Sequence, residues 1–360
     1  VYTSADHNLT AQLDYVRLLH KLAQNNIQVF AVLGNHDPLE AWKAKIPFPP
    51  NVHIFPTESV ERVPLVVDGE EVAAIYGQSY AKSEQRENLA WKFNRAAGDR
   101  FSIGMLHTQV GSRESTYAPC TLEDLKECGM DYWALGHIHK HEILCEKPYI
   151  VYAGNPQGLD CTETGPRGCY YVEVGPYGTT DLEFIDTSIV RWESIDLAID
   201  GIESVSELRE SVRFAKEKVR RNIGKPTFLT VNFTGSGSMY HVLNNPEATQ
   251  YWLDSWREEE QGKYAFVMVE RLRNLARPKM NLGERSKLPD SVGDYLNVFD
   301  KLEKLAPEEK VKALRDILMS RPEFERLGTY GRALTDERLL ETFEKAKWLG
   351  VQKLLEHRRG

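Results

Sequence analysis

Cysteine is scarce in this sequence, and long apolar runs are missing from it. Its 360 residues include five cysteines, and none of them stands in a CxxC pair. An odd number at unpaired spacing indicates neither a disulfide framework nor a zinc knuckle, so we expect a protein of the reducing cytoplasm. No run reaches the roughly 20 apolar residues of a membrane span, so we expect no membrane segment. The formal net charge of −8 disfavours a surface coated with nucleic acid but is compatible with local basic patches.

Three apolar runs are present, and each ends in side chains of the kind that bind metal ions. They are residues 29–33 before Asn35 and His36, residues 101–106 before His107, and residues 132–135 before His137 and His139. Each run has the length and composition of a short buried strand. Open α/β sheets gather their ligands at the carboxyl ends of such strands. Four histidines and one asparagine at the same edge therefore predict a metal site.

The donor types narrow the choice of metal. Imidazole nitrogen and amide oxygen suit manganese, iron or zinc, and the lack of a thiolate in the motifs disfavours a structural zinc site. On a continuing strand His137 and His139 would point to the same side, with Ile138 opposite, so they can reach one ion or two neighbouring ions. Two ions about 3.5–4 Å apart stabilise both the attacking and the leaving oxygen of a phosphoryl transfer. Such a pair also needs a bridging carboxylate, and none of the three motifs supplies one.

The pattern of elements predicts three parts. Over residues 1–186, helices alternate with strands and a strand-rich stretch follows, which predicts an α/β sandwich of two sheets flanked by helices. A capping box of Ser204 and Glu207 lies within a smaller α+β domain that we place at residues 187–288. Residues 289–360 are charged and helical in pattern.

The motifs resemble a known family. GNHD, a lone histidine in LHT, and GHIH follow one another as do the later motifs of the calcineurin-like metallophosphoesterases. Further segments resemble the SbcD/YhaO-type DNA-repair exonuclease branch, namely Tyr117 to Leu122, Asp131 to His137, Gly154 to Gly158 and Glu163 to Gly168. The likeness is strong over about residues 1–185 and diffuse beyond.

The resemblance implies a metal-dependent DNA exonuclease that uses two Mn²⁺ ions. By motif, Asn35, His107 and His137 would bind the second ion and His139 the first. His36 would protonate the leaving oxygen or stabilise the transition state. The implied partners are DNA, an SMC-like (SbcC-type) ATPase subunit that docks on the C-terminal helices, and a second copy of the chain in a homodimer. A small helical cap packed on its own core is the alternative reading of those helices.

The sequence departs from the family at its beginning. The family opens with a DxH motif and a GD motif, which supply two ligands of the first metal and the bridging Asp, and neither is found here. The pair Asp6 and His7 precedes a helix and fits capping better than metal binding. From the family's strand–helix–strand unit we expect about 40–50 further residues upstream of Val1. Without them, one weakly bound ion or a role in partner binding is the alternative, and a phosphoesterase on a substrate other than DNA is another.

Other polar residues admit two readings. We expect Asp37 to accept structural hydrogen bonds rather than bind metal, and Arg167 to lie on the surface rather than contact phosphate. Two basic stretches, at residues 213–225 and 271–287, are either solvated faces or contacts for a DNA backbone.

Overall fold

The chain divides into two compact units. The computed structural model describes residues 8–38, 40, 46–112, 114–178, 180–325 and 334–356, so the Asp6 and His7 pair lies outside the described residues. The first unit contains residues 1–194, 219–230 and 260–268, and the second contains residues 195–218, 231–259 and 269–360. The division into 1–186, 187–288 and 289–360 expected from composition stays a prediction.

Most of the first unit is a helix followed by strands and short helices. Its elements are α1 (Leu9–Gln24), β1 (Val29–Ala31), β2 (Val52–Ile54), β3 (Glu61–Val67), β4 (Glu70–Gln78), η2 (Leu89–Lys92), β5 (Ser102–His107), α2 (Leu122–Glu127), β6 (Tyr132–Gly136), β7 (Glu142–Glu146), β8 (Tyr149–Tyr152), β9 (Gly168–Val174) and β10 (Thr180–Asp186). The Asn8 side chain caps α1 by accepting from the Ala11 N–H. Asp68 and Gly69, both at positive φ, turn β3 into β4 as the hairpin signal predicts.

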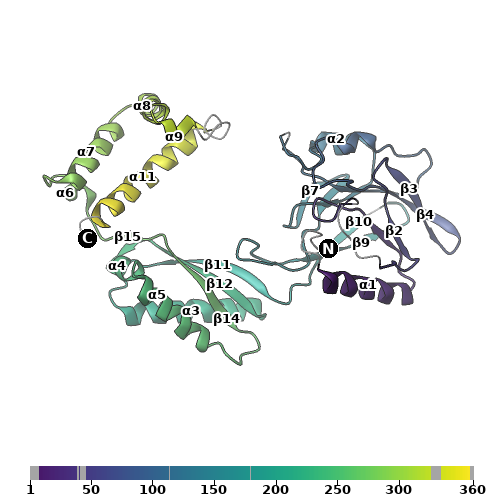
Figure 1. Cartoon of the computed structure of the whole chain (residues 1–360), viewed down its shortest axis with the longest axis horizontal. Helices are drawn as coiled ribbons and strands as arrows, with labels where there is room; N and C mark the ends of the chain where they lie inside the picture. Colours follow the sequence, from purple (N-terminus) through teal and green to yellow (C-terminus); the bar gives the residue numbers. More distant parts are fainter. Residues whose placement is uncertain are drawn as a thin grey trace. The chain divides into compact units, whose positions relative to one another are not determined.

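A six-stranded sheet with the order β3-β4-β5-β6-β8-β7 forms the centre of this unit (Figure 1). Strands β4, β5, β6 and β8 run parallel, and β3 and β7 pair antiparallel at the two edges. In the β5–β6 register His107 lies opposite Gly136. The carboxyl ends of β5 and β6 therefore meet at one edge of the sheet, directly before His137.

Each face of this sheet is covered by a different layer. On one face Trp133 and Leu106 pack with Leu89 of η2 and Leu125 of α2, and all four are fully buried. On the other face a smaller cluster around Val151 packs against the antiparallel pair β9–β10. The predicted α/β class, with sheets flanked by helices, is confirmed.

The parallel pair β1–β2 is fastened to the end of β4. The Leu33 N–H donates to Ser79 Oγ over 3.1 Å, and the Tyr80 N–H donates to the Leu33 carbonyl over 3.0 Å. Phe55 packs against Gly77, where no side chain would fit. These contacts place the loop that follows β1, with Asn35 and His36, beside the same edge as the ends of β5 and β6.

The rest of the chain begins with a sheet of the order β11-β12-β14, and the division between the two units falls within these strands. The elements are β11 (Arg191–Ala198), α3 (Val205–Ile223), β12 (Thr227–Thr234), β13 (Ser236–Gly237), α4 (Tyr240–Leu243), α5 (Pro246–Glu258), β14 (Val267–Asn274), β15 (Arg277–Pro278), α6 (Leu282–Arg285), α7 (Ser291–Glu303), α8 (Pro307–Met319), α9 (Pro322–Glu325) and α11 (Asp336–Glu356). Phe299, Leu314, Leu339 and Phe343 form the core shared by α7, α8 and α11. No helix among the described residues is both long enough and apolar enough to cross a bilayer.

Candidate metal-binding cleft

A cleft of about 600 Å³ opens at the edge where β1, β5 and β6 end. All five site residues expected from the sequence line it, namely Asn35, His36, His107, His137 and His139. Its other walls come from α1, β2 and the segment that follows β8. Three motifs that lie far apart in the sequence therefore meet in one cavity.

His107 is held rigidly at the base of this cleft. A Cβ at Gly34 would come within 2.5 Å of the His107 ring, and a Cβ at Gly136 within 3.0 Å, so the imidazole lies in a slot between two glycines. The Tyr80 ring meets it edge to face at 5.2 Å. Burial, together with the charges of the nearby histidines, lowers the pKa of His107 to about 4. The ring is therefore neutral at physiological pH, which is the form that binds a metal ion.

Asn35 and His137 flank this ring. The Asn35 Oδ1 lies 2.7 Å from His107 Nε2, and the rings of His107 and His137 are 5.2 Å apart. Strand β6 ends at Gly136, and His137 adopts a φ of +105°, a conformation rare for a residue with a side chain. The strand therefore does not continue through His137 and His139, so the same-side arrangement expected on a continuing strand does not arise. The turn at His137 aims its ring across the end of β5, against Tyr117 at 4.6 Å.

His139 is held by hydrogen bonds instead. Its Nδ1 lies 2.5 Å from Glu163 Oε1, and its backbone oxygen accepts from Asn155 N at 3.0 Å and from Arg167 Nη1. Arg167 is only 6% exposed, so the expectation of a surface position for it is wrong. Arg167 also donates a hydrogen bond to the Thr164 carbonyl oxygen, so it holds two parts of this loop together.

The two remaining residues of the GNHD loop differ in their surroundings. His36 is exposed in the wall of the cleft, where a substrate can reach it. Asp37 Oδ1 accepts a hydrogen bond from Gly34 N over 2.9 Å, as expected for a structural acceptor. That bond closes the tight turn which carries Asn35 and His36.

The donor set fits a divalent cation over part of the site. Two ligand atoms about 2.1 Å from one ion and at right angles to each other lie about 3 Å apart, close to the observed separation of Asn35 Oδ1 and His107 Nε2. His137 stands next to this pair, and His139 lines the same cleft. Across the described part of the chain, no three His, Cys, Asp or Glu side chains converge closely enough to hold a metal by themselves. The present residues thus fit one ion through an amide and imidazoles.

Glu163 is a residue of this site to which the sequence assigned no role. It lies in a loop of small and polar residues, 24 positions after His139, and no periodicity connects the two. Its Oε2 accepts from Asn155 Nδ2 and from Leu159 N, each over 2.8 Å. Hydrogen bonds within the loop lower the pKa of Glu163 although burial opposes them, so it is a carboxylate at neutral pH.

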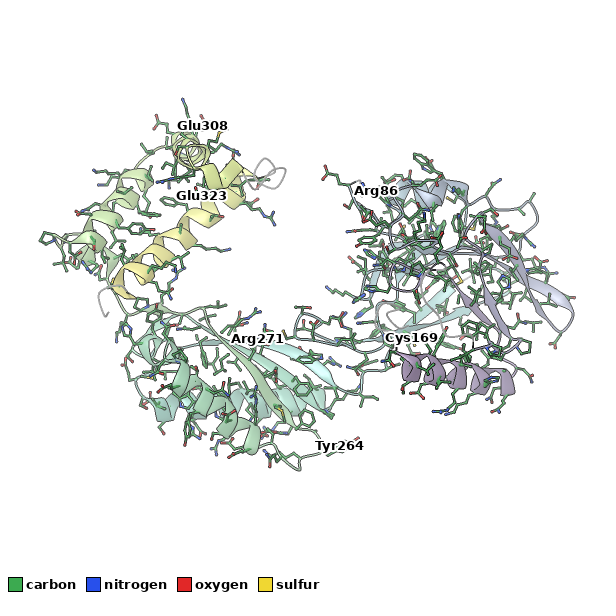
Figure 2. The ribbon with its side chains drawn as sticks, in the orientation of Figure 1. Arg86, Cys169, Tyr264, Arg271, Glu308 and Glu323 are labelled. Carbon is green, nitrogen blue, oxygen red and sulfur yellow. The ribbon has the colours of Figure 1, made fainter. Side chains whose placement is uncertain are left out.

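Acidic neighbours neutralise much of the two basic stretches. Arg213 pairs with Glu210, Arg220 with Glu260, Lys225 with Asp186, Lys279 with Glu203, Arg285 with Asp290 and Lys287 with Glu284. These pairs favour the solvated or structural reading over a DNA contact. On β14, Arg271 and Arg273 are exposed and make no ion pair with any described residue; Figure 2 labels the first of them.

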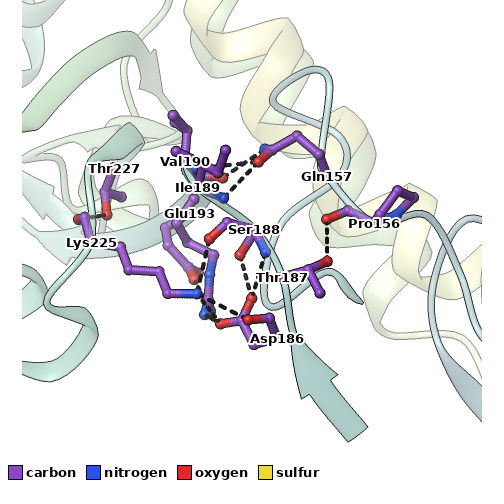
Figure 3. A network of polar contacts seen from close by, with 11 residues as sticks. Pro156, Gln157, Asp186, Thr187, Ser188, Ile189, Val190, Glu193, Lys225 and Thr227 are labelled. Carbon is purple, nitrogen blue, oxygen red and sulfur yellow. Dashed lines mark hydrogen bonds and ion pairs between the residues drawn. The ribbon is translucent and has the colours of Figure 1, made fainter. Parts of the chain in front are cut away.

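A further polar network steadies the segment after β8. Asp186 receives hydrogen bonds from Ser188 and ion pairs from Lys225 at 2.9 Å and Arg191 at 2.5 Å (Figure 3). Gln157, a residue of the cleft wall, bonds the backbone of Ile189 and Val190 in the same network. These bonds therefore tie the cleft wall to the residues directly before β11.

Comparison with known proteins places these features in a family. The family model described as Calcineurin-like phosphoesterase matches residues 5–141, and the one described as Metallophosphoesterase YhaO, middle domain, matches residues 192–277. A protein named Uncharacterized metallophosphoesterase YhaO, from Bacillus subtilis, is 33% identical over 286 residues, which cover 78% of this chain and 69% of that relative. The DNA double-strand break repair protein Mre11 of Methanocaldococcus jannaschii is 27% identical over 224 residues, which cover 57% of this chain and 56% of that relative. The chain thus spans little more than half the length of the second protein.

Proposed function

Because this chain belongs to the calcineurin-like metallophosphoesterases, in the branch that includes YhaO, we propose that it is a metal-dependent phosphodiesterase that degrades DNA from its ends. The observation that carries the proposal is the single cleft in which Asn35, His36, His107, His137 and His139 come together. The similarity to a DNA double-strand break repair protein supports DNA as the substrate.

Most of the cleft residues named above serve to bind metal ions. Asn35 and His107, with His137 beside them, hold one ion, and His139 contributes to a second; Mn²⁺ suits these donors. When bound, divalent ions polarise the phosphate and lower the pKa of the attacking water. The ring of His107 is neutral at physiological pH, which is the charge state that can bind an ion.

His36 serves the leaving group. Water adds to phosphorus, the bond from phosphorus to the sugar oxygen breaks, and His36 gives a proton to that departing oxygen. Its exposure on the cleft wall lets it approach the scissile bond without binding an ion itself. This role requires that His36 matter for turnover and not for metal affinity.

The test is the release of nucleotides from linear DNA in Mn²⁺ by His36→Ala. We expect a loss of about 10²–10⁴-fold in rate, because general acid catalysis contributes that much, with Mn²⁺ affinity unchanged. His20→Ala, which removes an exposed histidine of α1 in the same unit, is the matched control and should keep full activity. Equal rates for the two variants would overturn the role of His36.

A small phosphodiester tested in parallel separates the substrate classes. Faster turnover of the small substrate than of DNA would favour the alternative, a phosphoesterase acting on another substrate. The exposed Arg271 and Arg273 of β14 support contact with a nucleic-acid backbone, since neither makes an ion pair with a described residue.

Features of the chain after residue 187 support the proposal that the protein works in a larger assembly. The match to a middle domain over residues 192–277 supports a separate domain within 187–288. The C-terminal helices expose the apolar side chains of Val298, Ile317 and Met319, each at least 46% exposed. These features support docking of an SMC-like ATPase on residues 289–360 through a helix-in-groove contact. Homodimerisation and a cytoplasmic location belong to the same proposal.

A further inference from the structure

One short segment, residues 154–168, supplies the described hydrogen bonds around His139. The His139 backbone oxygen accepts from Asn155 N at 3.0 Å and from the buried Arg167. Gly154, at a φ of +78°, lies so close that a Cβ there would come within 2.7 Å of the same oxygen. The backbone of His139 is thus fixed independently of any contact that its ring makes.

The ring has its own partner in the same segment. Glu163 Oε1 lies 2.5 Å from His139 Nδ1, and the Glu163 side chain is only 13% exposed whereas that of His139 is 53% exposed. The other carboxylate oxygen is occupied, because Oε2 accepts from Asn155 Nδ2 and Leu159 N at 2.8 Å each. Two donors therefore fix the orientation of the carboxylate and direct Oε1 at the imidazole.

We propose that Glu163 is a positioning residue that fixes the tautomer and orientation of His139. A carboxylate is only an acceptor, so the atom that faces it, Nδ1, must carry the proton. The lone pair of the neutral ring is then on Nε2, the nitrogen that can bind an ion from the cleft. The inference rests on the proposed function, since it assigns His139 to a metal.

A purely structural role for Glu163 leads to a different expectation. If the carboxylate only tied the loop together, the bonds from Asn155 and Leu159 to Oε2 would be its whole contribution. Any substitution that keeps one acceptor oxygen for those donors would then be silent. Glu163→Gln is such a substitution.

Glu163→Gln also changes which ring nitrogen of His139 must carry the proton. Its carbonyl oxygen can still accept from Asn155 and Leu159, while its amide group faces His139 and donates. Nδ1 must then accept, which moves the ring proton to Nε2 and blocks the metal-binding lone pair. We expect Mn²⁺ affinity, measured by titration calorimetry, to fall about 10–100-fold, the usual effect of losing such a partner. The melting temperature should stay close to that of the control.

Asp160→Asn is the matched control. It removes one negative charge from the same segment, and Asp160 Oδ1 bonds Thr162, not His139. A general loss of negative potential near the cleft would therefore weaken Mn²⁺ binding in both variants alike. An affinity loss in Glu163→Gln no larger than in Asp160→Asn would overturn the proposal.

A second measurement does not depend on metal binding. Nitrogen-15 NMR of the histidine rings in metal-free protein at about pH 8.5, with His139 assigned by its absence in His139→Gln, reports the tautomer directly. We expect Nδ1–H in the wild type and in Asp160→Asn, and Nε2–H in Glu163→Gln. An Nε2–H ring in the wild type would refute the positioning role. Absence of Mn²⁺ binding by the wild type would instead refute the proposed function, and the tautomer would still test Glu163.

Discussion

The part of the cleft around His107, called the packed half, and the part around His139, called the bonded half, are held in place by different interactions. His107 is half-buried and set by packing, in a slot between Gly34 and Gly136. His139 is half exposed and set by hydrogen bonds from a loop without regular secondary structure. A packed side chain is positioned by the core of the sheet and is displaced by even one added methyl group, because interiors are close-packed. A hydrogen-bonded side chain depends instead on each of its polar partners.

Breaking the packed half should have the largest effect. In Gly34→Ala the new methyl group would lie 2.5 Å from the His107 ring, so the ring must leave its slot. We expect a loss of about 3 kcal/mol in the free energy of unfolding, at the upper end for overpacking, together with loss of Mn²⁺ binding. Urea denaturation and metal titration measure the two effects.

Gly283→Ala provides the comparison for that variant. A Cβ there meets only the Asn281 side chain at 3.4 Å, so stability and metal binding should stay as in the wild type. If Gly34→Ala bound Mn²⁺ as tightly as Gly283→Ala does, the packed half would not be set by packing.

Acid should also weaken the polar network that supports the bonded half. Burial alone would raise the pKa of Asp186, but bonds from Ser188 and Lys225 and the charge of Arg191 outweigh it and lower the pKa to about 2. A depressed folded pKa means that this stabilisation is complete above the ordinary value of 3.8 and is lost as the pH falls from about 4 to 2. The shift corresponds to about 2 kcal/mol at neutral pH.

The measurement is the free energy of unfolding against pH for the wild type and Asp186→Asn. The wild type should lose about 2 kcal/mol more than the variant between pH 4 and 2, since only it has this carboxylate to protonate. Parallel curves would mean that the network around Asp186 contributes no pH-dependent stability.

A single hydrogen bond to the bonded half should have the smallest effect. Trp192 Nε1 donates to the Gly158 carbonyl over 3.1 Å, and the ring packs on Phe228 at 4.8 Å. Trp192→Phe keeps an aromatic ring but removes the donor, so we expect a loss of about 1 kcal/mol in the free energy of unfolding. Trp91→Phe removes a similar bond, to Asp124, from a residue that is 74% exposed, where water can replace it. Chemical denaturation should show a smaller loss for Trp91→Phe, and equal losses would contradict the role of burial.

The same contrast explains what the sequence could predict. Strands β5 and β6 follow from their apolar runs, and the position of His107 follows from the end of such a run. Strand β11 was missed because its first half is charged, where Arg191 pairs with Asp186 and Glu193, and only Ile195 and Leu197 of its second half alternate with exposed residues. Strand β14 extends to Asn274, past its apolar residues, because backbone hydrogen bonds continue a strand whatever its side chains.

Within the site, the position of His107 was predictable from the sequence and that of His139 only in part. The motif order identified His139, and the resemblance included the segment with Glu163 and Arg167, but nothing in the sequence connected these two to His139, which they contact across gaps of 24 and 28 residues. The turn at His137 was also beyond the sequence, because a positive φ outside glycine is imposed by the surrounding fold and not by the residue itself. The assignment of metal and catalytic roles to these residues stays a prediction.

The left-handed turn at Gly154 has a consequence for how such proteins can be recombined. It starts a segment that brings the backbone clamp, the ring partner and the buried arginine of His139 in one continuous piece of chain. Exchanging residues 154–168 as a single cassette between relatives would carry the whole arrangement across. Exchanging its members one at a time would instead separate residues that are hydrogen-bond partners, such as Asn155 and Glu163.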